Sequence, residues 1–386
     1  MSADVFDVIV IGAGIHGAAV AREAAARGLR VAVIEQFDAP ARATSSKSSK
    51  LIHGGLRYLE SQQFHLVYEC LREQKILLRT APHLVHRSEF AIPVLNNAKR
   101  PSWLIQMGLW TYWLLGGARP RRLPLNAAQE DGLRCAQFSA LLSYTDAQTD
   151  DAMLTRAVLA SAQTMGAQVR FNASCESIDV AQASVSVTFR QQEALHTWQS
   201  AAVVNAAGPW VNHVLQRVIP TPTTLDMEWV RGSHIELPGA LSRCYYVEAP
   251  DGRAVFILPW KGHRLVGTTE RVHSGLAEQC EASDEEIRYL LDTYNRYFVP
   301  AHQVSDVITA WAGLRVLPAA KQSPFSRARD AVLLCDRPQQ PRVISIYGGK
   351  LTSHRATAER VIRQLGLQTK GLQIDTKRQV LPLLSE

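Results

Sequence analysis

The residues best suited to chemistry lie in three short segments that contain glycine. Residues 12–17 read Gly-Ala-Gly-Ile-His-Gly, residues 51–58 place two glycines beside His53 and Arg57, and residues 348–352 read Gly-Gly-Lys-Leu-Thr. Glycine allows the backbone to approach a ligand closely. A glycine turn that leads from a strand into a helix also points backbone N–H groups at phosphate oxygens. These segments therefore predict a site for a phosphate-bearing ligand.

The first segment lies inside a strand, helix and strand pattern of about 30 residues, the length that a βαβ crossover needs. Residues 7–11 are an apolar run, residues 18–27 are rich in alanine at helical spacing, and residues 31–34 are a second apolar run that ends in Glu35. A single glycine motif is weak, but here the flanking elements agree with it.

Each polar or small residue of this unit has an expected physical role. Gly12 allows the tight turn, Gly14 lets the backbone approach a pyrophosphate, and Gly17 lets the helix pack closely on the strand. Glu35 can accept hydrogen bonds from a ribose diol. The pattern predicts a bound dinucleotide, FAD or NAD, over the alternative of a glycine turn that holds no ligand.

The elements after this unit alternate between helices and strands. The pattern predicts helices over 64–79, 285–297 and 353–365, and strands over 185–189, 202–205, 255–259, 265–269 and 343–347. The strands 255–259 and 265–269 are expected to pair in an antiparallel sheet. The glycine turn at 348–352 leads from the last strand into the last helix and is expected to close over the same ligand.

The amino-acid composition indicates the general class of protein. The chain has 386 residues, a formal net charge of +7, 46% hydrophobic and 20% charged residues, which is ordinary globular usage and corresponds to about two domains. The positive charge suits an anionic ligand, an anionic membrane surface or nucleic acid. The six cysteines show no spacing typical of a zinc site, so we expect no metal, and we expect free thiols. The amino terminus shows no secretory signal.

One apolar segment, residues 103–115, raises the question of whether the chain spans or contacts a membrane. Its thirteen uncharged residues are too few to cross the hydrocarbon core, which needs about 20 residues as a helix. It contains three of the eight tryptophans, and cations flank it: Lys99, Arg100, Arg119, Arg121 and Arg122. Such a segment suits a membrane interface. The alternative, which the residue pattern alone favours slightly, is a buried helix with solvated basic ends.

The sequence closely resembles the family of FAD-dependent glycerol-3-phosphate dehydrogenases, within the D-amino-acid-oxidase-like flavoproteins. The resemblance covers nearly the whole chain and rests on these motifs in order: VIVIGAGIHG, TSSKSSKLIHGGLRYLE, YTDAQTDDAML, VNAAGPWV, RGSHIEL, FILPWKG, LVGTTE, AGLRVL and IYGGKLTSHR. It implies FAD as the cofactor. It also implies that residues 44–50, which look like a flexible linker by composition, form an ordered FAD-binding loop.

The resemblance implies an α/β fold with an FAD-binding Rossmann-like domain interleaved with a substrate domain built mainly on an antiparallel sheet. We expect residues 1–80, 145–215 and 305–386 to form the discontinuous FAD-binding domain. Residues 81–144 and 216–304 are expected to form the substrate or cap domain.

Site residues follow from the same resemblance, position by position. The expected cofactor-binding residues are Gly12, Ala13, Gly14, Ile15, Gly17, Glu35, Thr44, Ser45, Ser46, Ser49, Lys50, Leu51, Gly208, Trp210, Gly349, Lys350, Leu351 and Thr352. The expected substrate-binding residues are Arg57, Tyr58, His234, Arg315, Arg329 and Thr352. The expected catalytic residues are His53, His234, Arg57, Arg315 and Lys350, with either histidine as the base. Guanidinium groups match phosphate oxygens.

The implied activity is FAD-dependent oxidation of sn-glycerol 3-phosphate to dihydroxyacetone phosphate, with electrons passed to a quinone. The implied location is cytoplasmic, in peripheral contact with the inner membrane, with no nucleic-acid partner. Two alternatives are an FAD enzyme for another small 2-hydroxy acid or amine, and a catalytically silent flavin-binding subunit.

The sequence departs from the family pattern at three places. The usual helical carboxy-terminal domain would begin where this chain ends, at Glu386. The family's Gly-Thr-Thr-Asp ends in Glu270 here, and its Gly-Val-Arg-Pro reads Gly-Leu-Arg-Val at residues 313–316. These departures bear on substrate identity and assembly more than on FAD binding.

Overall fold

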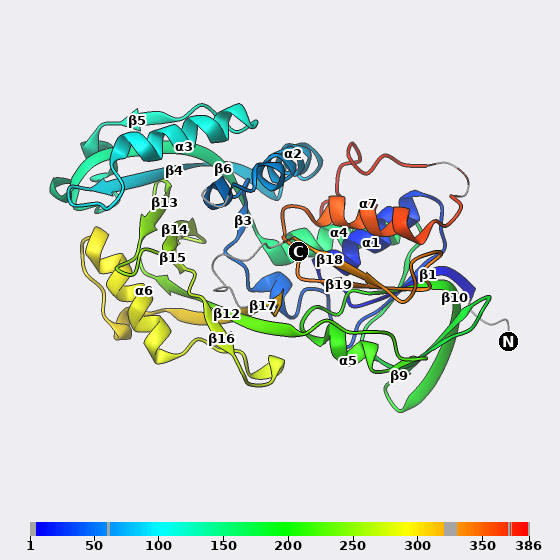
Figure 1. Ribbon diagram of the computed structural model, residues 1–386. Helices are drawn as coiled ribbons and strands as arrows, with labels where there is room; N and C mark the ends of the chain where they lie inside the picture. Colours follow the sequence, from blue (N-terminus) through cyan, green and yellow to red (C-terminus); the bar gives the residue numbers. More distant parts are fainter. Residues whose placement is uncertain (1–4, 60–61, 320–329, 370, 372, 385–386) are drawn as a thin grey trace.

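A computed structural model describes residues 5–59, 62–319, 330–369, 371 and 373–384. Two large sheets lie end to end in it, each with helices packed against its faces (Figure 1). The chain passes between the two sheets several times, so each sheet is assembled from segments that are distant in the sequence. This arrangement confirms the predicted α/β class with a second, mainly antiparallel sheet.

The first sheet is parallel at its centre and antiparallel at one side. Its order is β11 (Val218–Ile219), β8 (Ala173–Val180), β9 (Val185–Gln191), β10 (Ala194–Asn205), β1 (Val5–Ile11), β2 (Val31–Ile34) and β7 (Gln168–Arg170). β19 (Val343–Tyr347) also pairs with β10, in parallel, and β18 (Val332–Cys335) pairs with β19. The central strands are buried on both faces, as their continuous apolar runs predict.

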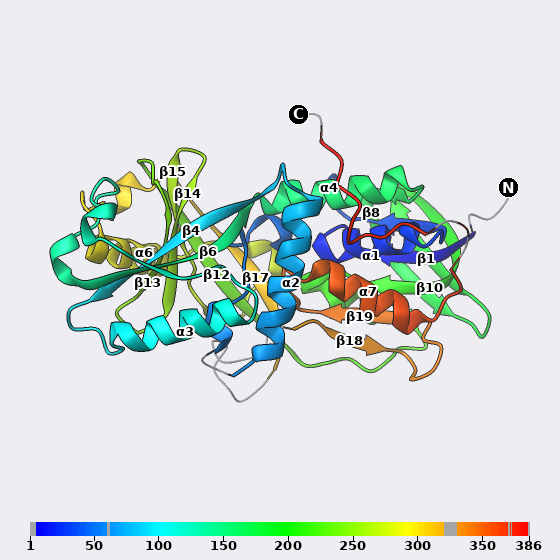
Figure 2. The same ribbon diagram turned by 90° about the horizontal axis from the view of Figure 1, so that it is seen from above.

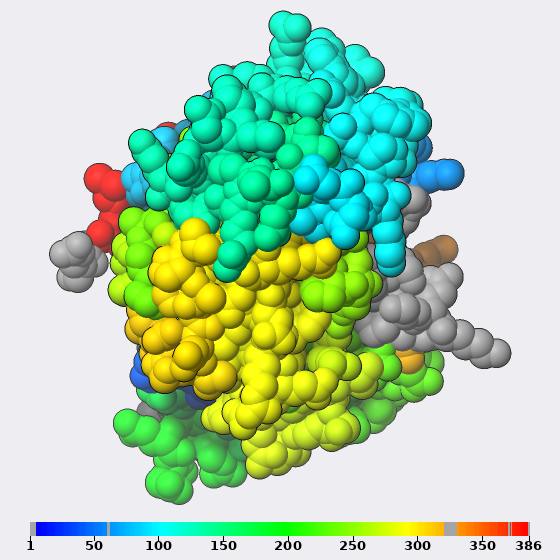
Figure 3. All heavy atoms as spheres, turned by 90° about the vertical axis from the view of Figure 1, so that its left-hand side faces the viewer, coloured from blue at the N-terminus to red at the C-terminus, as the bar shows by residue number. Residues whose placement is uncertain are grey.

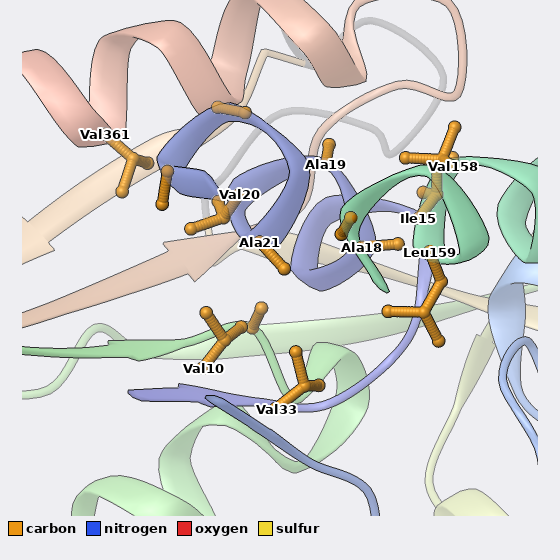
Figure 4. Close-up of a cluster of buried hydrophobic side chains, with 14 of the residues drawn as sticks. Val10, Ile15, Ala18, Ala19, Val20, Ala21, Val33, Val158, Leu159 and Val361 are labelled. Atoms are coloured by element: carbon orange, nitrogen blue, oxygen red, sulfur yellow. The ribbon is translucent and has the colours of Figure 1, made fainter. Parts of the chain in front are cut away.

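Three helices cover one face of this sheet: α1 (Ile15–Ala26), α4 (Asp151–Thr164) and α7 (His354–Leu365) (Figures 1 and 2). α1 lies between the sheet and the other two helices and is buried along almost its whole length. Figure 4 shows Val10 and Val33 of the sheet below α1, with Val158 of α4 and Val361 of α7 beside it. The alanines of α1 fit because a small side chain lets helices and sheet approach closely.

The second sheet is antiparallel except where β13 pairs with β4. Its order is β16 (Arg271–His273), β12 (Met227–Leu237), β15 (His263–Gly267), β14 (Ala254–Trp260), β13 (Cys244–Glu248), β4 (Val85–Leu95), β6 (Phe138–Thr149) and β3 (Leu51–Ile52). β17 (Thr309–Pro318) pairs with β12, and β5 (Arg121–Leu123) pairs with β6.

Helices close the second sheet on its two faces. α6 (Asp284–Tyr297) packs on one face through Leu290, Leu291 and Tyr294, while α2 (Phe64–Thr80) and α3 (Ser102–Leu114) pack on the other. Seen from this end of the molecule, α6 in yellow lies below the cyan and teal residues that connect β4 to β6 (Figure 3). The remaining helices are short: α5 (Val211–Leu215), η1 (Thr44–Ser46), η2 (Leu56–Leu59), η3 (Leu125–Ala128), η4 (Cys135–Gln137), η5 (Gly208–Trp210), η6 (Ala277–Gln279) and η7 (Val304–Asp306).

The membership of the sheets differs from the expected domain boundaries at four places. β3 belongs to the second sheet although residues 1–80 were assigned to the FAD-binding domain, and β11 belongs to the first sheet although residues 216–304 were assigned to the cap domain. β6 crosses the expected boundary at residue 145, and β17 pairs with β12 of the second sheet although residues 305–386 were assigned to the FAD-binding domain. Both strands run from one sheet toward the other. The boundaries remain a proposal, and these strands are the places where the two parts are joined.

The apolar segment 103–115 forms the surface helix α3, so the buried-helix interpretation is wrong. Only Leu109 and Tyr112 of this helix are buried, while Trp103 and Leu114 expose 61% and 75% of their surface. The sequence pattern favoured burial because the helix is apolar on all sides, so no polar stripe marks the face that is exposed to water. Among the described residues, no helix reaches the length and apolarity needed to span a bilayer.

Candidate active site

A cavity of about 380 Å³ receives residues from both sheets. From the first sheet, its wall includes the turn after β1 and the end of β2, with Gly12, Gly14 and Glu35. The wall also includes His53, Arg57 and residues from strands of the second sheet. The three glycine-containing segments that the sequence singled out therefore meet at one place.

The glycine turn after β1 leaves its backbone open to the cavity. Gly12 has a φ of +101°, which glycine adopts without strain, and a Cβ on Gly17 would lie only 1.9 Å from the carbonyl oxygen of Gly12. A Cβ on Gly14 would meet only the Ser45 hydroxyl, at 3.1 Å. Gly12 and Gly17 are thus required by the turn itself, while Gly14 keeps the approach to the amino terminus of α1 open, where an anion is stabilised.

Glu35 is a fixed carboxylate at the end of β2. It is buried, and its two oxygens accept hydrogen bonds from the backbone N–H groups of Ala13, at 2.5 Å, and Phe37, at 3.0 Å. Burial raises the pKa of Glu35, although these backbone donors oppose the shift. The side chain lines the cavity next to the glycine turn, where the sequence analysis expected a contact with ribose.

The serine-rich segment 44–50 is an ordered wall of the cavity, so the linker interpretation from composition is wrong. Ser45 accepts a hydrogen bond from the N–H of Ile15 at 2.9 Å, and Thr44 donates to the carbonyl of Leu314 at 2.8 Å. Lys50 donates to the carbonyl of Ser46 at 2.7 Å and forms an ion pair with Asp151 at 2.6 Å. Hydrogen bonds to distant parts of the chain hold this loop in place.

Four predicted cofactor-binding residues, Ala13, Gly17, Ser46 and Lys50, are not among the described residues that line the cavity. Ser46 donates to the carbonyl of Ala43, and the buried ammonium of Lys50 faces Asp151. These side chains hold the loop rather than point into the cavity. The other predicted cofactor-binding residues line it: Gly12, Gly14, Ile15, Glu35, Thr44, Ser45, Ser49, Leu51, Gly208, Trp210, Gly349, Lys350, Leu351 and Thr352.

The turn after β19 meets the segment that carries His53. The Thr352 hydroxyl lies 3.2 Å from the backbone nitrogen of His53 and 3.3 Å from its carbonyl oxygen. The Lys350 ammonium lies 4.1 Å from the centroid of the Tyr58 ring, a cation–π contact. All four residues line the cavity. The turn after β19 and the segment that carries His53 and Tyr58 thus lie side by side in the cavity wall.

Two guanidinium groups, of Arg57 and Arg315, lie on the wall of the second sheet. The Glu270 Oε1 atom lies 2.9 Å from Nη1 of Arg315 and 3.6 Å from Nη1 of Arg57. Nη2 of Arg315 donates to the Thr268 hydroxyl at 3.4 Å. All these side chains line the cavity. The arrangement can bind an anion between two arginines.

His53 is among the described residues that line the cavity, and His234 is not; His234 lies behind Ser49, which lines it. It is buried beside the ring of Trp311, and its Nε2 is 2.9 Å from the Ser49 hydroxyl. Burial, together with the charges of Arg315 and Lys50, lowers the pKa of His234 to about 3. The imidazole is therefore neutral at physiological pH. The predicted substrate residue Arg329 lies outside the described residues.

Asp146, for which the sequence predicted no role, is buried and lines the cavity. Its carboxylate accepts hydrogen bonds from the N–H of Gly54 at 3.2 Å, from Gln74 at 2.5 Å and from the Tyr112 hydroxyl at 2.9 Å. Burial raises the pKa of Asp146 to about 7. The carboxylate fixes the backbone next to His53. The only signal in the sequence was its place in the motif YTDAQTDDAML.

His16 and Glu270 are two further residues whose place the sequence did not reveal. His16 follows the glycine turn and lines the cavity, and burial, with the charge of Arg360, lowers its pKa to about 4. Glu270 was noted only as a departure from the family motif, and its position between two arginines depends on strand pairing that one motif does not show.

Comparison with known proteins gives consistent matches. The family model described as DAO, FAD dependent oxidoreductase, matches residues 7–363. The chain is 37% identical over 369 residues to the D-erythritol 1-phosphate dehydrogenase of Brucella abortus (strain 2308), covering 93% of this chain and 73% of the relative. It is 36% identical over 397 residues to the aerobic glycerol-3-phosphate dehydrogenase of Escherichia coli (strain K12), covering 97% and 76%.

The solved structures agree with these relatives. The crystal structure of the glycerol-3-phosphate dehydrogenase from Bacillus halodurans complexed with FAD superposes with a TM-score of 0.77 at 26% identity. The match covers 98% of this chain and 68% of that chain.

Proposed function

This chain belongs to the DAO family of FAD-dependent oxidoreductases, and from that premise we propose that it oxidises sn-glycerol 3-phosphate to dihydroxyacetone phosphate and passes the electrons to a quinone. The chain is an enzyme of this family, and its cofactor is FAD. The substrate and the acceptor are the proposal. The observation that carries it is the pair Arg57 and Arg315 on the wall of the cavity that the glycine turns also line.

The cavity residues that come from the first sheet fit FAD. The open backbone at Gly14 and the amino terminus of α1 suit the pyrophosphate, and the carboxylate of Glu35 suits a ribose diol. When bound, FAD supplies the two-electron acceptor for the carbon-bound hydrogen of the substrate.

The two arginines suit the phosphate of the substrate. A phosphate dianion offers several oxygens to two forked donors, which fixes both its charge and its orientation. A carbon skeleton that extends from this phosphate would reach toward Tyr58, whose ring contacts both Arg57 and Lys350, and toward His53, which lines the same cavity. Holding the alcohol there orients it for oxidation.

We assign the base to His53. Its side chain belongs to the cavity wall, while the imidazole of His234 is buried beside Trp311 with a strongly lowered pKa. His53 takes the proton of the substrate hydroxyl as the carbon-bound hydrogen leaves. The Lys350 ammonium stabilises the negative charge that develops during the reaction.

A second substrate, D-erythritol 1-phosphate, is favoured by the relative at 37% identity that bears its name. It has one more hydroxylated carbon than glycerol 3-phosphate and the same phosphate group. Both substrates require the arginine pair, and a carboxylate substrate would present only a single negative charge to it.

The test is a dye-linked reduction assay with FAD-loaded protein. We expect turnover of glycerol 3-phosphate well above that of glycerol, lactate, 2-hydroxyglutarate and glycine. Turnover of D-erythritol 1-phosphate above glycerol 3-phosphate would replace the proposed substrate by the second one. Equal rates with glycerol and its phosphate would show that no phosphate anchor exists.

We further propose that α3 contacts the cytoplasmic face of the inner membrane, where a quinone is reached. Trp103, Leu104, Met107 and Leu114 of α3 are exposed. The cations that flank the helix are also exposed: Lys99, Arg100, Arg119, Arg121 and Arg122. An exposed apolar helix with basic flanks suits an anionic membrane interface, where each cation contributes about 1 kcal/mol.

Vesicle sedimentation tests this contact. Replacing Arg119, Arg121 and Arg122 by Gln should weaken binding to vesicles that contain anionic lipid, with dye-linked activity unchanged. The control removes three exposed arginines elsewhere, Arg156, Arg363 and Arg378. If both triple variants sediment like the parent at every salt concentration, α3 does not form the contact.

A further inference from the structure

Glu270 places a negative charge inside the proposed phosphate subsite. One of its carboxylate oxygens lies 2.9 Å from a nitrogen of Arg315 and 3.6 Å from a nitrogen of Arg57. The side chain is only 7% exposed, and it lines the cavity together with both arginines. The carboxylate therefore occupies the donors that a phosphate would need, in a place where water screens charge poorly.

The backbone that carries Glu270 is held in place. Its carbonyl oxygen accepts a hydrogen bond from Nη1 of Arg253 at 3.1 Å. The preceding residue, Thr269, donates from its hydroxyl to Glu286 at 2.6 Å and accepts from the N–H of Ser233 at 2.9 Å. The carboxylate can leave the arginines only by rotation of its own side chain. Arg253 also lines the cavity, so a third arginine lies near residue 270.

From this geometry we propose that Glu270 is an internal counter-ion that competes with the phosphate of the ligand for Arg57 and Arg315, and so sets the affinity of the site for phosphate esters. The inference rests on the proposed function, because it needs a phosphate at the arginine pair. An arginine pair that is free of Glu270 for only a fraction of the time binds every phosphate-bearing ligand more weakly by that same fraction.

The competition has a characteristic signature. Substrate and product carry the same phosphate, so Glu270 weakens the binding of both by one common factor. The binding of inorganic phosphate is weakened by that factor too. Glycerol, which makes no phosphate contact, is not affected. A residue that merely held the arginines in position would have the opposite effect, because its removal would weaken phosphate binding.

The experiment compares Glu270→Gln with the parent, both loaded with FAD. Titration calorimetry measures the Kd for inorganic phosphate, and the dye-linked assay measures KM for glycerol 3-phosphate and kcat/KM for glycerol. We expect the Kd and the KM to fall by the same factor, about tenfold or more, with glycerol unchanged. Glu285→Gln, which removes a carboxylate from an exposed ion pair with Arg271, is the matched control and should change none of these values.

A Kd for inorganic phosphate that stays the same or rises in Glu270→Gln overturns the proposal. If Glu270→Gln does not retain FAD, Glu270→Asp serves instead. It keeps the charge but withdraws the carboxylate by one methylene, so we expect a smaller fall in the same Kd, and an unchanged or higher Kd again overturns the proposal. Failure of the proposed function is seen separately, as a parent enzyme that binds inorganic phosphate but does not oxidise its esters.

Discussion

Replacing Gly17 by alanine should damage the protein far more than replacing Gly14 by alanine. The Cβ on residue 17 would lie 1.9 Å from the carbonyl oxygen of Gly12 and 2.9 Å from its carbonyl carbon. Both atoms are backbone, so no side-chain rotation relieves the overlap, and the turn must move by about 1 Å or more. Forced overpacking costs about 1–3 kcal/mol. We expect Gly17→Ala to lose about 2–3 kcal/mol of unfolding free energy.

Gly14→Ala is the matched comparison. Gly14 has an ordinary φ of −70°, and its Cβ would meet only the Ser45 hydroxyl, at 3.1 Å. Alanine stabilises a helix less than glycine does at the N-cap position, so we expect the free energy of unfolding to fall by about 1 kcal/mol at most. The added methyl group stands where the backbone lines the cavity, and we therefore expect FAD content to fall sharply.

Thermal unfolding of the flavin-free proteins separates the two effects, and flavin absorbance of the purified proteins measures cofactor retention. Gly17→Ala should unfold at a clearly lower temperature than Gly14→Ala, and both should be paler than the parent. A Gly17→Ala protein as stable as the parent would refute the packing argument. A Gly14→Ala protein with full flavin content would refute the assignment of Gly14 to cofactor binding.

Three further changes have expected outcomes. Arg315→Lys keeps the charge but loses the forked donor, so kcat/KM for glycerol 3-phosphate should fall about ten- to hundredfold while that for glycerol does not change. Asp151→Asn leaves the buried ammonium of Lys50 without its carboxylate and should cost about 3–5 kcal/mol in denaturant unfolding, whereas Asp375→Asn, at an exposed ion pair, should cost almost nothing. Burial lowers the pKa of His354 to about 3. As the pH falls below about 6.5, this histidine is protonated in the unfolded chain but stays neutral in the folded chain. The free energy of unfolding therefore falls, by about 2–3 kcal/mol at about pH 4.5. His354→Gln should lose less stability over that range, which thermal unfolding at several pH values would show.

Local patterns predicted the amino-terminal part of the site well. β1, α1 and β2 follow one another within 30 residues, and their apolar and small residues pack against each other. The turn at Gly12 depends on a backbone angle that only glycine adopts freely, so its role can be inferred from residue type. Glu35 was expected at the end of β2, and it lies there.

Other features depend on partners that are distant in the sequence. The ammonium of Lys50 and the backbone N–H of Ser48 both bind Asp151, about 100 residues away, and composition alone cannot tell such a held loop from a flexible one. His234 and His53 both lie in family motifs, but only the pairing of β12 with β17 places the ring of His234 beside Trp311, behind the residues that line the cavity. The orientation of one side chain on a strand is set by that pairing and not by the motif.

The central position of β1 also bears on how the chain folds as it is synthesised. β1 leaves the ribosome before the other described strands, yet one of its two neighbours, β10, ends at residue 205. At roughly 5–20 residues per second, β1 waits about 10–40 seconds for that partner. During this interval one edge of the strand is open to other chains. We expect the nascent protein to need protection by a chaperone until β10 has been made.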